Sequence, residues 1–269
     1  MRLLFIGDII GRPGRELLRK GLKALVNHHG VDFVIANAEN SAAGFGITKD
    51  IGDTLLEYGV DVMTSGNHVW DKKEAMNYIA TERRLLRPAN YPAGAPGRGS
   101  CVAESGDGRP VGIVNVMGRV FMTPIDDPFA VVLKEIEAVR AKARIVIVDF
   151  HAEATSEKVA MGWHLDGKVT LVVGTHTHVQ TGDERILPNG TAYLTDAGMT
   201  GPHDSIIGME REPALSRFLT GLPSKFEPAT GNPRLNGVIV DADEATGKAT
   251  GIMRVNLGER DLLALGGTA

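Results

Sequence analysis

The chain has 269 residues, of which 43% are hydrophobic and 23% charged, a composition ordinary for a soluble globular protein. Its formal charge at pH 7 is −4, so it has no global basic field, which argues against a protein that holds long nucleic acid non-specifically. Its length allows one large α/β domain or two small ones, each with a substantial core.

The first part of the chain alternates between short apolar runs and amphipathic segments. Buried strands are predicted at Arg2–Ile6, Asp32–Ala36 and Val60–Thr64. Helices are predicted from Pro13, which suits a first helical turn, toward His29, and then over Thr48–Tyr58 and Asp71–Ile79. This alternation favours parallel pairing of the strands with short connections.

The pattern changes after Pro88, where a stretch rich in proline and glycine leads into further strands and a helix over Pro128–Lys142. The predicted strands are Ser100–Glu104, Val111–Val116, Arg144–Phe150 and Val169–Gly174. Two hairpins are predicted, Arg185–Leu187 with Thr191–Thr195 around an Asn-Gly turn, and Asn236–Asp241 with Gly251–Asn256. With no repeat and no clear linker, we expect one domain, residues 1–269, of two packed sheets with helices outside.

The number of cysteines and the N-terminal sequence indicate the cellular compartment in which the protein is expected. The single cysteine, Cys101, excludes an intrachain disulfide and fits a reducing environment. The apolar run before Gly7 and Asp8 is too short for a signal peptide or a membrane span. We therefore expect a cytoplasmic protein with no membrane partner.

Residues that can bind metal ions follow the predicted strands. They are Asp8, Glu39, Asn40, Asn67, His151, His176 and His178. Because sites in α/β sheets form beyond the carboxyl ends of the strands, these loops are expected to converge. His176 and His178 alternate in Gly-Thr-His-Thr-His, and alternate residues of an extended chain project to one side. Carboxylate and amide oxygens combined with imidazole nitrogens suit Mn, Fe or Zn.

Each position alone has an ordinary structural explanation. These explanations are a loop cap for Asp8, a segment cap for Glu39–Asn40, a helix N-cap for Asn67 and a buried core position for His151. The spacing of the glycines around Asp8 also differs from the dinucleotide-binding fingerprint. It is the joint occurrence of the ligand types that favours a metal site.

As an ordered set, these motifs resemble the calcineurin-like metallophosphoesterase superfamily. The set consists of Gly7-Asp8, Glu39-Asn40, Gly66-Asn67-His68, His151 and Gly174-Thr-His-Thr-His178. The sequence departs from the superfamily at Ile10, where a histidine is usual, and at Glu39, where the bridging residue is usually Asp. These departures, with Asn-Ala-Glu-Asn at 37–40 and Asp-Ala-Gly-Met-Thr-Gly-Pro at 196–202, resemble the bacterial YmdB-like phosphodiesterases.

The resemblance implies an α/β fold, a four-layer α-β-β-α sandwich of two mixed sheets, and two transition-metal ions, Fe or Mn with Zn as an alternative. One metal would take Asp8, Glu39, Asn40 and His178. The other would take Glu39, Asn67, His151 and His176, so that Glu39 would bridge the pair. Asn40 is included because Ile10 cannot ligate and the first metal would otherwise lack a ligand.

YmdB-like enzymes are known for hydrolysing 2′,3′-cyclic nucleotides, with side activity on other phosphodiesters. The resemblance implies cleavage of the 2′ bond by a metal-bridging hydroxide, with His68 as the proton donor to the leaving oxygen. His203, in Gly-Pro-His-Asp, is a weaker candidate for contact with the substrate. The expected partner is a small phosphodiester or nucleotide, and a homo-oligomer stays open.

Two other functions stay open. A phosphomonoesterase or protein phosphatase could use the same ligands, because metal ligands do not choose between esters. A metal- or nucleotide-sensing regulator without turnover belongs to a different class of protein. The presence of His68 beside a full ligand set disfavours the regulator, because sensing does not require a proton donor.

Overall fold

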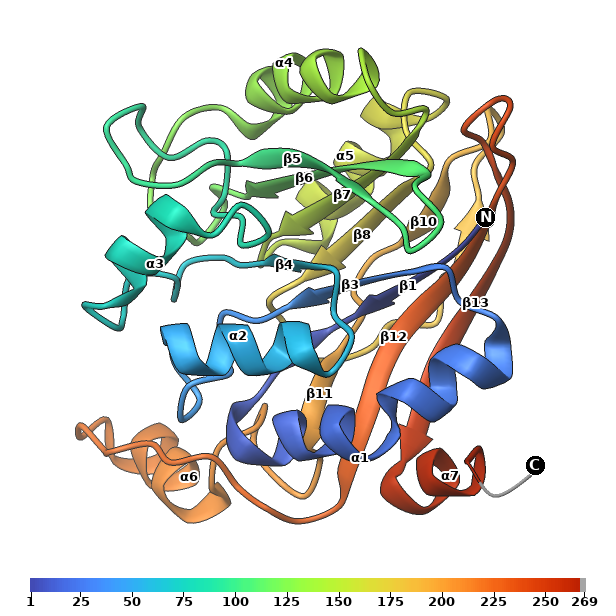
Figure 1. The fold of residues 1–269 in the computed structure, drawn as a ribbon. Coiled ribbons are helices and arrows are strands. Elements are labelled where there is room, and N and C mark those ends of the chain that lie inside the picture. Colours follow the sequence, from blue (N-terminus) through green and yellow to red (C-terminus); the bar gives the residue numbers. More distant parts are fainter. Residues whose placement is uncertain (267–269) are drawn as a thin grey trace.

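The computed structural model describes residues 1–266, which form two packed β-sheets with helices on both outer faces (Figure 1). The helices are α1 (Gly11–His29), α2 (Lys49–Glu57), α3 (Ala75–Thr81), α4 (Pro128–Arg140), α5 (Thr155–Leu165), α6 (Arg211–Thr220) and α7 (Glu259–Ala264). The strands are β1 (Arg2–Ile6), β2 (Asp8–Ile9), β3 (Phe33–Asn37), β4 (Val62–Thr64), β5 (Ser100–Glu104), β6 (Pro110–Met117), β7 (Ile145–His151), β8 (Leu171–Thr175), β9 (Arg185–Ile186), β10 (Ala192–Leu194), β11 (Met199–Pro202), β12 (Pro233–Ala242) and β13 (Ala249–Gly258).

The first sheet has seven strands in the order β2-β11-β12-β1-β3-β4, with β13 paired to β12. Strands β1, β3 and β4 are parallel, as predicted. The long β12–β13 hairpin confirms the second predicted hairpin, and β12 pairs antiparallel with the whole of β1. The sheet is therefore mixed, because its N-terminal strands share it with strands from the end of the chain.

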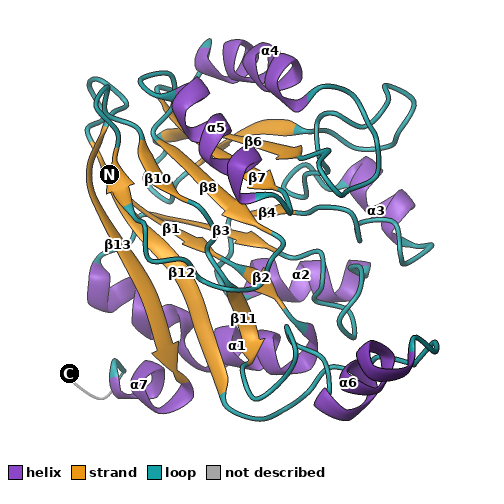
Figure 2. Cartoon of the chain, turned by 180° about the vertical axis from the view of Figure 1, so that it is seen from behind, coloured by secondary structure: helices purple, strands orange, loops and turns teal. Residues whose placement is uncertain are grey.

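The second sheet has six strands in the order β5-β6-β7-β8-β10-β9. Four of them, β6, β7, β8 and β10, are labelled in Figure 2. Strands β6, β7, β8 and β10 run parallel, while the edge strands β5 and β9 are antiparallel to their neighbours. The β9–β10 pair confirms the predicted Asn-Gly hairpin. The predicted fold class is thus confirmed as mixed α/β with two packed mixed sheets.

Alternating residues of the strands supply different layers of the core. In β1, Leu3 and Phe5 face the core between the sheets, whereas Leu4 and Ile6 pack toward α1. On the other side of the molecule, residues such as Val148 pack against α4 and α5. Because the strands are buried on both faces, they read in the sequence as continuous apolar runs.

The structure contains elements that the sequence patterns did not predict, namely β2, α5, β11, α6 and α7. Helix α5 escaped prediction because its inner face buries Glu157 and Lys158, so its apolar stripe is interrupted. Helix α3 begins at Ala75, not Asp71, because the residues before it form turns.

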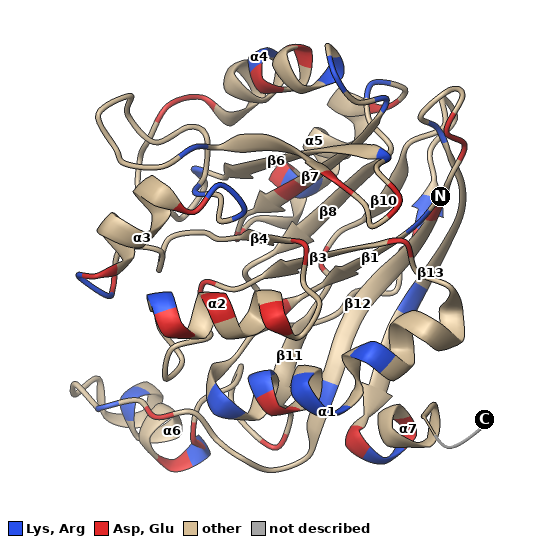
Figure 3. Ribbon diagram, viewed as in Figure 1, with Lys and Arg blue, Asp and Glu red and all other residues tan. Residues whose placement is uncertain are grey.

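The distribution of charged residues and the length of the helices relate to the predictions of no long nucleic acid and no membrane as partners. Acidic and basic residues are interspersed along the outer helices in the view of Figure 3. Among residues 1–266, no helix has the length and apolar character needed to cross a membrane.

Candidate metal centre

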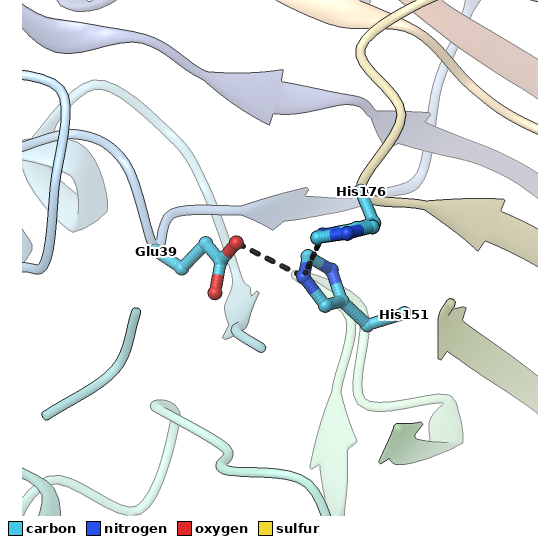
Figure 4. A group of neighbouring side chains, drawn as sticks. All are labelled: Glu39, His151 and His176. Carbon is cyan, nitrogen blue, oxygen red and sulfur yellow. Dashed lines mark hydrogen bonds and ion pairs between the residues drawn. The ribbon is translucent and has the colours of Figure 1, made fainter. Parts of the chain in front are cut away.

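The carboxyl ends of β3 and β4 in one sheet and of β7 and β8 in the other meet at one edge of the sandwich. There the side chains of Glu39, His151 and His176 point toward one another (Figure 4). One ligand-type atom from each of these residues lies within 4.8 Å of the others. Glu39 and His151 are fully buried, although both can carry a charge. The expected convergence of loops from separate strands is therefore present in the structure.

A first cluster of ligand-type atoms surrounds Nε2 of His151. Oε1 of Glu39 lies 3.0 Å from this nitrogen, and Oδ1 of Asn67 also lies 3.0 Å away. Nδ1 of His176 lies 3.1 Å from the same atom. These residues are the four that the family resemblance implies for one metal.

A second cluster surrounds Nε2 of His178. This nitrogen lies 3.7 Å from Oδ1 of Asp8 and 3.3 Å from Nδ2 of Asn40. Asn40 also donates to Oε1 of Glu39 at 3.4 Å, which links this cluster to the first. Glu39 thus contacts residues of both clusters.

Unpartnered buried oxygens show that the donor set fits metal ions. Oδ1 of Asp8 and Oδ1 of Asn40 are buried and have no hydrogen-bond partner. Leaving such an atom unsatisfied costs ~1–3 kcal/mol, so a buried oxygen of this kind is suited to a ligand. The other oxygen of Asp8 accepts the backbone N–H of His176 at 3.2 Å. Oxygen and imidazole donors together match the preferences of Mn, Fe and Zn.

Burial and nearby charges shift the pKa values of the buried groups at the centre, often in opposite directions. Burial raises the pKa of Asp8. Burial also opposes ionisation of Glu39, but His151 and the backbone N–H of His68 outweigh it and lower the pKa of Glu39 to about 2. The pKa of His151 is raised to about 9 by Glu39 against the effect of its burial. A cation at Nε2 of His151 would displace this proton and take over its role beside Glu39.

Hydrogen bonds behind the candidate ligands fix which nitrogen of each imidazole faces the centre. Oγ1 of Thr175 donates to Oδ1 of Asp149 at 2.7 Å, so it accepts from Nδ1 of His151 at 2.9 Å. Nδ1 of His178 donates to the carbonyl of Ile207 at 2.8 Å. In both histidines Nε2 is therefore the nitrogen available for a metal.

The supporting shell around Asp149 was missed by the sequence analysis. Asp149 is fully buried, which raises its pKa to about 7, and it accepts bonds from Thr64, Thr175 and Asn37. The signal was present, because a carboxylate stands inside the otherwise apolar run of β7. Its partners lie on other strands, and only the fold brings them together.

The backbone of the His-Thr-His segment differs from the predicted extended form. His176 has φ of 99° and His178 has φ of 64°, both in the left-handed region. The segment is therefore not an extended strand, and the alternation of an extended chain does not explain how its two imidazoles reach their different clusters. Such backbone strain costs ~1–3 kcal/mol per residue and persists where surrounding contacts fix it.

His68 lies beside the clusters without belonging to either. Its backbone N–H donates to Oε2 of Glu39 at 2.9 Å, and its Nδ1 lies 2.8 Å from Oδ2 of Asp71. Its side chain is 30% exposed and packs edge-on against Phe45, with ring centroids 5.0 Å apart. The backbone of His68 is therefore bound to the centre, while its imidazole ring is partly exposed to solvent.

His203 lies apart from the ligand clusters. Its Nδ1 is 3.1 Å from the carbonyl of Gly201, and its Nε2 is 3.1 Å from Oδ1 of Asn236. These contacts engage both ring nitrogens with the protein. Contact of His203 with a substrate stays a prediction.

Gly66 offers a test of how tightly His151 is held. A Cβ at Gly66 would lie 2.1 Å from Cδ2 of His151, whose buried ring has no room to move. We expect Gly66→Ala to destabilise the protein by ~1–3 kcal/mol, as overpacking does, and to weaken metal binding. Thermal denaturation and metal titration would measure both effects. Gly94→Ala is the matched control, because a Cβ there meets nothing within 4 Å, and equal behaviour of the two variants would contradict the prediction.

Comparison with known proteins agrees with this geometry. Residues 4–255 match the family of YmdB-like proteins. A 2′,3′-cyclic-nucleotide 2′-phosphodiesterase of Bacillus subtilis (strain 168) is 48% identical over 255 residues, which cover 95% of this chain and 96% of that protein.

Solved structures show the same fold. A hypothetical protein from Thermus thermophilus superposes with a TM-score of 0.88 at 44% identity, covering 96% of this chain and 99% of that one. A novel phosphatase from Mycoplasma pneumoniae gives a TM-score of 0.89 at 35% identity, covering 96% and 93%. With the family match extending over nearly the whole sequence, the chain belongs to the YmdB-like family.

Proposed function

We propose that the chain is a metal-dependent phosphodiesterase that hydrolyses 2′,3′-cyclic nucleotides at the 2′ bond, with other phosphodiesters as further substrates. The observation that carries this proposal is the pair of ligand clusters joined by Glu39, with buried unpartnered oxygens on Asp8 and Asn40. The name of the Bacillus subtilis relative supports the substrate class. The name of the Mycoplasma structure supports phosphoester chemistry in general.

The proposed cofactors are two transition-metal ions, Fe or Mn, with Zn as an alternative. Asp8, Glu39, Asn40 and His178 would hold one ion, and Glu39, Asn67, His151 and His176 the other. When bound, the ions would offset the charge of the phosphate and lower the pKa of water at the centre.

His68 is proposed to donate the proton that the leaving oxygen requires, because a nucleotide alkoxide is a poor leaving group. The contact with Asp71 orients the ring through Nδ1 and leaves Nε2 as the nitrogen that would face the substrate. The hydrogen bond from its backbone N–H to Glu39 anchors the backbone of His68 beside the carboxylate that contacts both clusters.

The organisation and location of the chain are proposed on separate grounds. A single domain over residues 1–269, of which 267–269 lie outside the described residues, is supported by the core that both sheets share. A cytoplasmic location is supported by the single cysteine.

The test of the proposed function is metal dependence combined with a substrate panel. Prolonged chelation should abolish hydrolysis, and Mn²⁺ or Fe²⁺ should restore it, because no side chain at the centre can replace the Lewis acidity of the ions. Product analysis should show a 3′-phosphate from a 2′,3′-cyclic nucleotide. Full activity in a rigorously metal-free sample would contradict the proposal, and a clear preference for phosphomonoesters would favour the phosphatase alternative.

A further inference from the structure

A buried ion pair outside both ligand clusters lies behind the segment that carries His176 and His178. Nζ of Lys158, on α5, lies 2.5 Å from Oδ2 of Asp196, and their side chains are 2% and 1% exposed. The same oxygen accepts two hydrogen bonds from Thr177, one from its Oγ1 at 2.7 Å and one from its backbone N–H at 3.3 Å. Thr177 is the residue between the two histidines.

The contacts of Asp196 engage both of its carboxylate oxygens with groups of the protein. Its Oδ2 is occupied by Lys158 and Thr177, and its Oδ1 accepts the backbone N–H of Gly198 at 2.8 Å. The ammonium group of Lys158 balances the carboxylate charge inside the protein, which a buried anion requires. Asp196 is therefore a fixed acceptor whose position does not depend on a bound ion.

The place of Thr177 explains how the strained backbone beside it is maintained. Left-handed φ angles flank it on both sides, at His176 and His178, and neither residue is a glycine. Thr177 is thus held by two hydrogen bonds to one oxygen, directly between the two residues with strained backbone. The imidazole of His176 then reaches His151, while that of His178 reaches Asp8.

We propose that Asp196, held in place by Lys158, is a positioning residue that sets the geometry of both metal sites through Thr177. The proposal rests on the ligand assignment of the proposed function. It predicts that one hydroxyl group, on a side chain that touches no metal, controls the affinity of both sites together. Supporting groups of this kind contribute about 10–100-fold in metal affinity elsewhere.

Thr177→Val tests this without leaving a buried charge unpaired, because valine keeps the shape of threonine and removes only the donor. We expect Mn²⁺ to bind both sites of the variant about 10–100-fold more weakly in a calorimetric titration. The electron paramagnetic resonance spectrum of two Mn²⁺ ions that share a ligand should appear only at correspondingly higher Mn²⁺ concentration. Thr177→Ser retains the hydroxyl and should bind like the wild type.

Thr54→Val is the matched control, because it removes a hydroxyl that donates to the carbonyl of Asp50 on the exposed face of α2. Wild-type affinity in Thr177→Val would overturn the proposal, as would equally weak binding by Thr177→Ser. A metal-free melting temperature of Thr177→Val far below that of the control would also overturn it, because the bond would then serve folding in general. If the wild type itself fails to bind two ions, the proposed function fails instead.

Discussion

Glu39→Gln is expected to lower kcat/KM on a phosphodiester by ~10³-fold or more, because it removes the charge that would be shared by two cations. The amide keeps the size of the side chain but presents one oxygen, so it cannot bridge two ions as a carboxylate does. Metal titration should show that the variant retains at most one tightly bound ion. Steady-state kinetics at saturating Mn²⁺ would measure the remaining activity.

Glu153→Gln is the control for this variant. Oε2 of Glu153 lies 3.2 Å from Nε2 of His176, so this carboxylate is also close to the centre, but its side chain is 49% exposed. An exposed contact of this kind contributes little, and the control should keep two ions and nearly full activity. Equal losses of activity and bound metal in the two variants would contradict the proposed bridging role of Glu39.

His68→Ala is expected to lower turnover of diesters with alkoxide leaving groups by roughly 10²–10⁴-fold while metal content stays nearly unchanged. The ring has its polar contact with Asp71 and packs against Phe45, so its loss should not empty either site. A p-nitrophenyl phosphodiester has a good leaving group, and its hydrolysis should fall much less.

Asn67→Ala separates metal binding from proton donation at the neighbouring position. Oδ1 of Asn67 lies 3.0 Å from Nε2 of His151, so this variant should lose metal together with rate. If His68→Ala slowed both substrates equally with metals retained, stabilisation of phosphoryl charge would replace proton donation as its role. Loss of metal from His68→Ala would make His68 a ligand.

Local patterns in the sequence predicted the elements whose signal is local. The strands around the centre are apolar runs that end in polar residues, and the structure places those ends at one edge. Prediction failed for a helix that buries polar side chains. In α5 the buried Lys158 interrupts the apolar stripe by which a helix is recognised in the sequence. Prediction also failed for the short β2 and β11, which have too few residues to carry a period.

The supporting contacts of the centre could not be predicted for a different reason. Asp149 and Asp196 are visible as polar residues among apolar ones, but their partners lie on strands and helices far away in the sequence. His176 and His178 also have left-handed φ angles, which residues other than glycine seldom adopt and which the local sequence pattern does not indicate. Local motifs thus indicate which residues are candidate ligands, whereas the orientation of their side chains depends on tertiary structure.

The pairing of β1 with β12 has a consequence for synthesis of the protein. The N-terminal amino group donates to the carbonyl of Ala242, 241 positions later, and β2, which carries Asp8, reaches β12 through β11. A ribosome adding about 5–20 residues per second needs roughly 10–50 s to produce that partner. Until then one edge of β1 lacks its neighbour and is open to mispairing, a hazard that chaperones counter. The candidate metal ligands, the last of which is His178, are therefore all synthesised before β12, the strand that completes the sheet beside β1.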